Sequence, residues 1–188
     1  QDLPLVWGRT ITSVFFGGGT PSLFPPEAID RFLQVASARL RFAPSLEITL
    51  ETNPGTAEHG RFEHYLAAGV NRLSFGVQSF DDGCLQRLGR IHDSAQADSA
   101  IKLAQDAGYS NFNLDLLYAF PQQTPAMAEH DIERALALQP THLSHYQLTL
   151  EPNTVFAAKP PAGLPDEAPA WDIQEHCQRL IADAGFDH

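Results

Sequence analysis

The feature that most limits the possible folds of this 188-residue chain is a fivefold alternation of strand and helix patterns. Apolar, β-rich runs are each followed by turn residues and then a helical pattern, and they stand at residues 11–16, 46–54, 71–80, 111–121 and 141–152. This alternation is typical of parallel strands joined by helical crossovers. The sequence therefore predicts an α/β fold built on a parallel sheet.

Helical patterns fill the intervals between the predicted strands, at residues 26–40, 61–69, 81–88, 94–107, 125–138 and 167–184. Pro25 and Pro26 lead the first helix, and Thr56-Ala-Glu-His introduces the second. Glycines follow several helix ends, as at Gly69 and Gly108. The Pro/Ala-rich stretch 157–170 is expected to form an ordered surface loop.

Two architectures satisfy this pattern, a doubly wound open sheet and a (βα) barrel. Polar residues lie in or just after every predicted strand: Thr20, Glu51, Gln78, Asp115, Gln147 and Thr149. An open sheet concentrates its ligand groups at one or two switch points, whereas a barrel gathers them from many strand ends. The distribution favours a partial (βα)6 TIM-like barrel of parallel strands with outer helices. Since the chain begins without Met and stops where a sixth strand would start, we expect a barrel truncated at both ends.

Charge and cysteine content exclude several classes of function. The net charge is −11 with only 12 Lys and Arg residues, which argues against a nucleic-acid surface. Cys84 and Cys177 are far apart and lack metal-type spacing, so we expect no disulfide framework and a reducing, cytoplasmic location. No apolar run approaches the roughly 18–20 residues of a membrane span.

Three consecutive glycines, Gly17 to Gly19, stand where the first strand ends. They are not a dinucleotide fingerprint, because Ser22 occupies the place of the last glycine, and no Gly-Lys-Ser/Thr follows as in a P-loop. Two interpretations stay open. The loop presents bare N–H and C=O groups to a small polar ligand such as an amino-acid moiety, or it is a tight turn with no ligand.

Glu51, Gln78 and Arg90 also allow a binding and a non-binding interpretation. Glu51 ends a strand, where it is either solvated or able to accept from an ammonium or from ribose hydroxyls. Gln78 follows Gly76, a glycine inside a strand that indicates close backbone approach or a bulge. Arg90 is either a surface residue or a fork for a carboxylate.

Asp115 lies in the middle of an apolar strand, and a buried carboxylate there must find partners. A structural ion pair and a ligand-facing role both satisfy that need, and we favour the second. His142 and His145 are three residues apart in a predicted strand and therefore point to opposite faces, which argues against a shared metal.

Six motifs, in this order, give the chain its resemblance to a known family: "FFGGGTPS", "ETNP", "RLSFGVQSF", "LGRIH", "NLDLLYAFPQQT" and "HLSHYQLTLEPNT". Together they resemble the radical S-adenosylmethionine superfamily, specifically the oxygen-independent coproporphyrinogen III oxidase-like proteins with their haem-chaperone branch. The resemblance spans nearly the whole chain. It implies S-adenosylmethionine as the cofactor, bound by Gly18, Gly19, Thr20, Glu51, Gln78, Arg90, Asp115 and Thr149.

The chain departs from that family at the iron–sulfur site. The family's CxxxCxxC loop, which holds three irons of a [4Fe–4S] cluster, is absent, and Cys84 and Cys177 cannot replace it. We therefore expect residues 1–188 to be a fragment of the core domain, without the first strand, the cluster loop and the C-terminal domain. Because the cluster supplies the electron that cleaves S-adenosylmethionine, we expect this piece to be inactive and assign it no catalytic or metal-binding residue.

The motifs "ETNPGT", "VQSF" and "HLSHYQLTLEPNTVF" favour the haem-chaperone branch, which binds and delivers haem. The alternative is a true coproporphyrinogen III oxidase, in which a radical abstracts a propionate hydrogen and CO2 leaves. An unrelated TIM-barrel enzyme is more remote, because no strand-end Lys or His/Asp cluster supports one. The expected partner is haem or porphyrin, and the two open sheet edges allow self-association.

Overall fold

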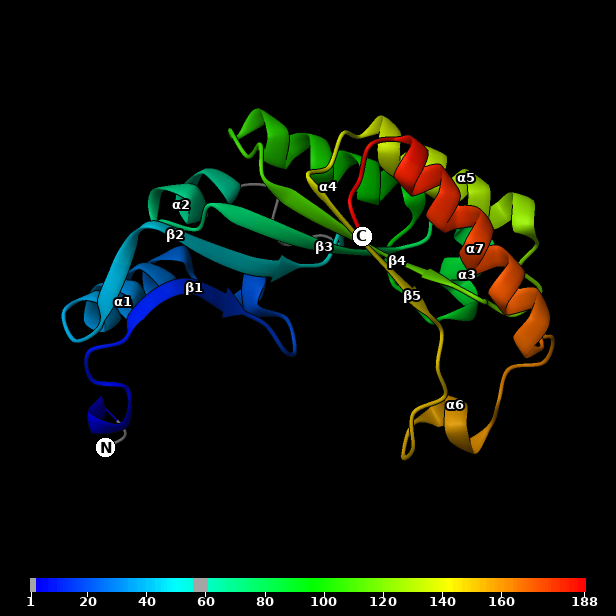
Figure 1. Cartoon of the computed structure of the whole chain (residues 1–188), viewed down its shortest axis with the longest axis horizontal. Helices are drawn as coiled ribbons and strands as arrows, with labels where there is room; N and C mark the ends of the chain where they lie inside the picture. The colour runs from blue at the N-terminus through cyan, green and yellow to red at the C-terminus, as the bar shows by residue number, and fades with distance from the viewer. Residues whose placement is uncertain (1–2, 56–60) are drawn as a thin grey trace.

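The computed structural model describes residues 3–55 and 61–188 and contains one sheet of five parallel strands. The strands are β1 (Thr10–Phe16), β2 (Arg41–Thr52), β3 (Arg72–Gln78), β4 (Phe112–Tyr118) and β5 (His142–Gln147). They lie side by side in chain order, β1-β2-β3-β4-β5. The sheet curls into an arch whose inner side is open (Figure 1). The predicted partial barrel of parallel strands is therefore confirmed.

Helices follow the strands as predicted and run along the outer side of the arch (Figure 1). They are α1 (Pro26–Ser37), α2 (Phe62–Ala67), α3 (Asp82–Arg87), α4 (Ser94–Asp106), α5 (Pro125–Ala137) and α7 (Glu167–Asp183). Short 3-10 turns stand at Leu3–Val6 and Pro21–Leu23. The predicted start of the second helix at Thr56-Ala-Glu-His lies outside the described residues.

The structure corrects several boundaries. The first helix ends at Ser37 instead of residue 40, and strands β3 and β4 end at Gln78 and Tyr118 instead of residues 80 and 121. Strand β2 begins at Arg41 instead of residue 46, because Arg41 and Phe42 pair with the start of β1. Strand β5 ends at Gln147 instead of residue 152, and the Leu148 N–H makes the last bond to β4, to the Tyr118 carbonyl oxygen over 2.9 Å. The stretch 157–170, expected as a loop, includes the end of the short helix α6 (Val155–Ala158) and the start of α7.

Alternation of side chains in the central strands decides which face of the sheet is packed. Every second residue is apolar, buried and part of the core shared with the helices: Leu73, Phe75, Val77, Phe112, Leu114 and Leu116. The residues between them in β3 and β4 are mostly polar: Ser74, Gly76, Gln78, Asn113, Asp115 and Leu117. Because burying each large apolar side chain stabilises the fold by about 1.5–3 kcal/mol, the polar set is directed to the inner side.

An aromatic cluster joins the sheet to α2. Phe62 meets Phe75 edge-on, with ring centroids 6.0 Å apart, and Phe75 meets Phe112 in the same way at 6.2 Å. The ring centroid of Tyr109, just before β4, lies 6.3 Å from that of Phe62.

In the described part of the chain, no helix has the length and apolar character needed to cross a membrane.

Two buried tyrosines give a matched test of this packing. Tyr65 is fully buried, and its hydroxyl lies 2.6 Å from the Ser22 carbonyl oxygen and 2.8 Å from that of Phe24. Tyr109 is 3% exposed, and its hydroxyl has no hydrogen-bond partner among the described residues. Burial accordingly raises the pKa of Tyr109 above its usual value.

We expect Tyr109→Phe to raise the free energy of unfolding by about 1 kcal/mol, because it removes a buried hydroxyl that no bond compensates. Tyr65→Phe should lower it by about 1–3 kcal/mol, because the two carbonyls lose that donor. Urea unfolding of the two variants and the wild type measures both changes. A loss of stability in Tyr109→Phe equal to that in Tyr65→Phe would contradict the assignment.

Candidate functional site

The carboxyl ends of strands β2 to β4 meet the loop after β1 around a cavity of about 240 Å³. Its lining residues are almost all polar or glycine: Gly19, Pro21, Glu51, Thr52, Asn53, Ser74, Gly76, Gln78, Arg90 and Asp115. Five of the eight residues predicted from sequence are among them: Gly19, Glu51, Gln78, Arg90 and Asp115. The structure therefore brings together groups that lie up to 96 positions apart in the chain (115 − 19).

The glycine loop is fixed to this cavity by Glu51. The Gly18 N–H donates to Glu51 Oε2 over 2.9 Å. Gly18 and Gly19 have φ of +82° and +60°, which favour glycine, and open space surrounds the place where a Cβ would stand. Gly17 is required for a different reason, since a Cβ at that position would lie 2.9 Å from the Phe15 ring. The triplet thus makes a tight turn and also presents bare backbone to the cavity.

The remaining three predicted residues, Gly18, Thr20 and Thr149, lie outside the lining of this cavity. Gly18 directly precedes the lining residue Gly19 and is bonded to Glu51, which also lines the cavity. Thr20 is adjacent to it, between Gly19 and Pro21, at the start of the 3-10 turn. Thr149 lies beyond the end of β5, where its exposed hydroxyl donates to Glu151 Oε1 over 2.9 Å. The structure therefore does not bring Thr149 together with the other predicted residues.

Gln78 ends β3 at a bulge. The pairing steps from Phe75 opposite Leu114 to Gln78 opposite Leu116, so β3 has one residue more than β4 over this stretch. Gln78 has a φ of +72°, which is costly for a residue with a side chain, and it is 8% exposed. A Cβ at Gly76 would lie 3.0 Å from Asn53 Oδ1 and 3.1 Å from Gln78 Nε2. Of the two alternatives stated for Gly76, close backbone approach or a bulge, the register shift supports the bulge.

Asp115 accepts hydrogen bonds from uncharged side chains on the inner face of the sheet. Ser74 Oγ donates to its Oδ2 over 3.1 Å, and Asn113 Nδ2 donates to its Oδ1 over 2.8 Å. Asn113 also donates to Ser74 Oγ over 2.9 Å and accepts from Ser144 Oγ over 3.0 Å. No ion pair within 4.0 Å is formed by Asp115 among the described residues. Its charge is thus supported by neutral donors and is directed to the cavity.

Arg90 and Asp115 line the same cavity, and Arg90 is exposed to solvent. Desolvation lowers the pKa of Arg90, and the negative charge of Asp115 opposes that change. A cation and two carboxylates, those of Glu51 and Asp115, therefore line one small hollow. A second hollow of about 340 Å³ shares Glu51 and Asp115 and extends along the inner face to Tyr146 of β5.

Ser74, Thr52 and Asn53 line the cavity but were not predicted. Ser74 could have been predicted from the sequence, since it is a polar residue between the apolar residues Leu73 and Phe75, which are buried. Thr52 and Asn53 stand inside the motif "ETNP", whose acid alone was singled out.

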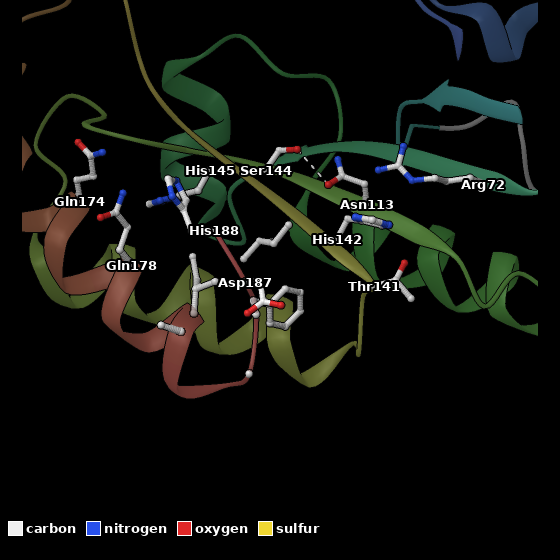
Figure 2. A pocket seen from close by; sticks show the side chains of 15 residues that line it. Arg72, Asn113, Thr141, His142, Ser144, His145, Gln174, Gln178, Asp187 and His188 are labelled. Atoms are coloured by element: carbon white, nitrogen blue, oxygen red, sulfur yellow. Dashed lines mark hydrogen bonds between the residues drawn. The ribbon is translucent and has the colours of Figure 1, made fainter. Parts of the chain in front are cut away.

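A larger hollow of about 900 Å³ lies beside β5 and α7 (Figure 2). It contains none of the eight predicted residues. His142 and His145 border it from opposite faces of the strand, because they are three positions apart. The His145 ring stacks on Tyr118 with centroids 4.6 Å apart, and desolvation lowers its pKa to about 4. His145 is therefore uncharged near neutral pH.

The two cysteines do not form a ligand set for an iron–sulfur cluster. Cys84 in α3 and Cys177 in α7 are both buried free thiols, and burial raises the pKa of each to about 11. Iron–sulfur clusters are held by thiolates, so protonated thiols at separate places are unsuited to one. The residues that the structure describes contain no group of three or more His, Cys, Asp or Glu that could hold a metal.

Comparisons with known proteins agree with this architecture. Residues 6–135 match the family model described as "Radical SAM superfamily". The chain is 50% identical over 178 residues to the heme chaperone HemW of Haemophilus influenzae, covering 95% of this chain and 46% of that protein. It is 48% identical over 186 residues to HemW of Escherichia coli, covering 99% of this chain and 49% of that protein. The chain thus spans about half the length of the curated relatives it matches.

Solved structures give the same fold. The coproporphyrinogen III oxidase HemN of Escherichia coli, which is described as a radical SAM enzyme, superposes with a TM-score of 0.85 at 30% identity, covering 98% of this chain and 43% of that one. The archaeal Elp3 of Methanocaldococcus infernus superposes with a TM-score of 0.75 at 18% identity, which shows likeness of fold alone.

The inner-face network predicts the effect of one substitution. Asn113→Ala should lower the free energy of unfolding by about 1–3 kcal/mol, because Ser74, Asp115 and Ser144 each lose a hydrogen-bond partner at buried or half-buried positions. Urea unfolding measures this change, with the exposed helix residue Gln86→Ala as control, for which a change under about 0.5 kcal/mol is expected. Equal effects in the two variants would show that the network contributes nothing.

Proposed function

Since this chain belongs to the radical SAM superfamily, we propose that its strand-end cavity binds S-adenosylmethionine. The observation that carries the proposal is the convergence of Gly19, Glu51, Gln78, Arg90 and Asp115 on one hollow. The cavity and the adjoining hollow are about 240 and 340 Å³ and together fall within the range of about 300–1,000 Å³ of small-molecule sites. The bound cofactor would supply a sulfonium-linked adenosyl group.

The charges of the cavity complement those of this cofactor. Glu51 and Asp115 contribute two negative charges and Arg90 one positive charge, which leaves a net charge of −1 (−2 + 1). S-adenosylmethionine carries a sulfonium, an ammonium and a carboxylate, so its net charge is opposite. Carboxylates accept from ammonium or ribose hydroxyls, and the Arg90 fork suits a carboxylate. Gln78 can both donate and accept.

The backbone of the glycine loop adds unhindered polar groups to this set. Its residues Gly18 and Gly19 leave open the space that side chains would fill, so a ligand can approach the main chain there. Thr20 continues this loop. Thr149 remains the weakest member of the proposed set, because the structure places it outside the cavity lining.

We further propose that the protein acts in haem handling as a haem chaperone. This rests on relatives named heme chaperone HemW that are up to 50% identical to the chain. In this proposal residues 1–188 are part of a core domain, the partner is haem or porphyrin, and the location is cytoplasmic. A [4Fe–4S] cluster does not fit the described residues of this chain, so we derive no step through one.

A second candidate is oxidative decarboxylation of coproporphyrinogen III. The superposition on the oxidase HemN, with a TM-score of 0.85, favours it. The identity to that enzyme is 30%, against 48% to the heme chaperone of the same organism. The chaperone function is therefore our conclusion.

The cofactor proposal predicts that Asp115→Asn and Glu51→Gln each weaken binding of S-adenosylmethionine by about tenfold. Each change removes a charge-assisted hydrogen bond, for which about 1.4 kcal/mol corresponds to that factor. Calorimetric titration measures the affinity, and exposed Glu63→Gln on α2 is the matched control. Unchanged affinity in both variants would exclude the cavity as the site.

The chaperone proposal predicts haem binding without turnover. Haem titrated into the full-length protein should give a saturable shift of its Soret absorbance. Coproporphyrinogen III supplied with S-adenosylmethionine and a reductant should release no CO2. Release of CO2 with formation of the decarboxylated porphyrinogen would instead identify the oxidase.

A further inference from the structure

The segment that carries Gln78 into the cavity is held in an unfavourable backbone conformation. The φ of Gln78, +72°, lies in the left-handed region, which is unfavourable for a residue with a side chain. Such a conformation persists only when surrounding groups determine it. The bulge that creates it lies between Phe75 and Gln78, at the end of the pairing between β3 and β4.

One group that fixes the backbone next to Gln78 is a buried acid in another βα unit. Asp131 of α5 is 2% exposed and accepts the Phe80 N–H over 2.6 Å at Oδ1. Its Oδ2 accepts the Ser79 hydroxyl over 2.7 Å. Ser79 Oγ in turn accepts the Asp81 N–H over 3.0 Å. The two residues directly after Gln78 are therefore tied to a helix about 50 positions later in the chain.

The other support lies directly before Gln78. His92 is 4% exposed, and its Nε2 lies 3.1 Å from the Val77 carbonyl oxygen. A carbonyl only accepts, so Nε2 carries the proton and donates. Desolvation lowers the pKa of His92, which keeps the ring neutral near pH 7. Val77 on one side and Ser79 with Phe80 on the other are thus both fixed by buried side chains.

From this arrangement we propose that Asp131 is a positioning residue, which holds the turn after β3 so that Gln78 keeps its left-handed backbone and lines the cavity. Asp131 itself does not line that cavity. It acts through the backbone N–H of Phe80 and the hydroxyl of Ser79. The consequence for ligand affinity rests on the proposed binding of S-adenosylmethionine, whereas the effect on the turn does not.

The surroundings of Asp131 determine the pH range of this effect. Its pKa is raised to about 6, chiefly by burial, while the bonds from Phe80 and Ser79 lower it. The titratable groups near it are Asp81 in the turn, His130 in α5, Cys84 in α3 and Cys177 in α7. Above pH 6 the carboxylate accepts charge-assisted bonds, and below pH 6 protonation weakens them. The hold on the turn should therefore loosen as the pH falls through about 6.

Hydrogen exchange of the ligand-free protein tests directly whether Asp131 fixes the turn after β3. Asp131→Asn should speed exchange of the amides of Gln78 to Asp81 at least tenfold at pH 7, while amides of β1 and α1 keep their wild-type rates. Glu133→Gln, an exposed acid on the same helix, is the matched control and should change neither. If Asp131→Asn does not fold, Ser79→Ala, which deletes one of the two bonds to Asp131 and also the acceptor of the Asp81 N–H, should give a smaller change in the same direction at Gln78 to Phe80. Unchanged exchange at residues 78–81 would overturn the proposal.

Affinity for S-adenosylmethionine tests the link to Gln78. Asp131→Asn should weaken binding about three- to tenfold at pH 7 and less at pH 5, where the wild-type acid is also uncharged. In a Gln78→Gly background, glycine adopts the left-handed backbone freely. There, Asp131→Asn should weaken the affinity for S-adenosylmethionine less than twofold. Equal losses in both backgrounds would show a general structural role and overturn the proposal. If the wild type binds no S-adenosylmethionine, the proposed function fails, and hydrogen exchange alone decides the role of Asp131.

Discussion

Burial of the apolar face of the parallel sheet is the constraint on which the rest of this structure depends. Leu73, Phe75 and Val77 of β3 are completely buried, as are Leu114 and Leu116 of β4. Because side chains alternate along a strand, this burial forces Ser74, Gln78, Asn113 and Asp115 to the inner side. A slip of one residue in register would bury these polar groups among the helices and expose the apolar ones. The packing of the outer face therefore determines the chemistry of the inner face.

Much of this arrangement could be predicted from the sequence, because strand and helix periods are local signals. The five strands, their order of appearance and the helices between them follow from apolar periodicity and from glycine and proline at the boundaries. Asp115 was recognisable because a carboxylate in an apolar strand needs partners, and Gly76 because a glycine inside a strand indicates a bulge. Five predicted residues share a cavity, although their role in binding stays a prediction.

What the sequence did not reveal depends on contacts between distant segments. Strand β2 extends back to Arg41 only because β1 offers a neighbour there. Thr149 shares a motif with β5, yet the strand ends two residues earlier and the hydroxyl bonds to Glu151 instead. Asp131 has no motif that marks it, since it stands on an ordinary amphipathic helix. Its burial and its bonds to Ser79 and Phe80 exist only after α5 packs against β4 and α7.

The order of the strands in the sheet also has a consequence for how the chain acquires its shape. Each strand lies beside the one that precedes it in sequence, so no strand must wait for a later one to fill a gap. A polypeptide emerging from the ribosome can therefore add one βα unit at a time to a growing edge, since domains are synthesised N-terminus first. The turn after β3 is completed late, because Asp131, which accepts from it, is synthesised about 50 residues later with α5. During synthesis that corner of the molecule becomes ordered after the strand that leads into it.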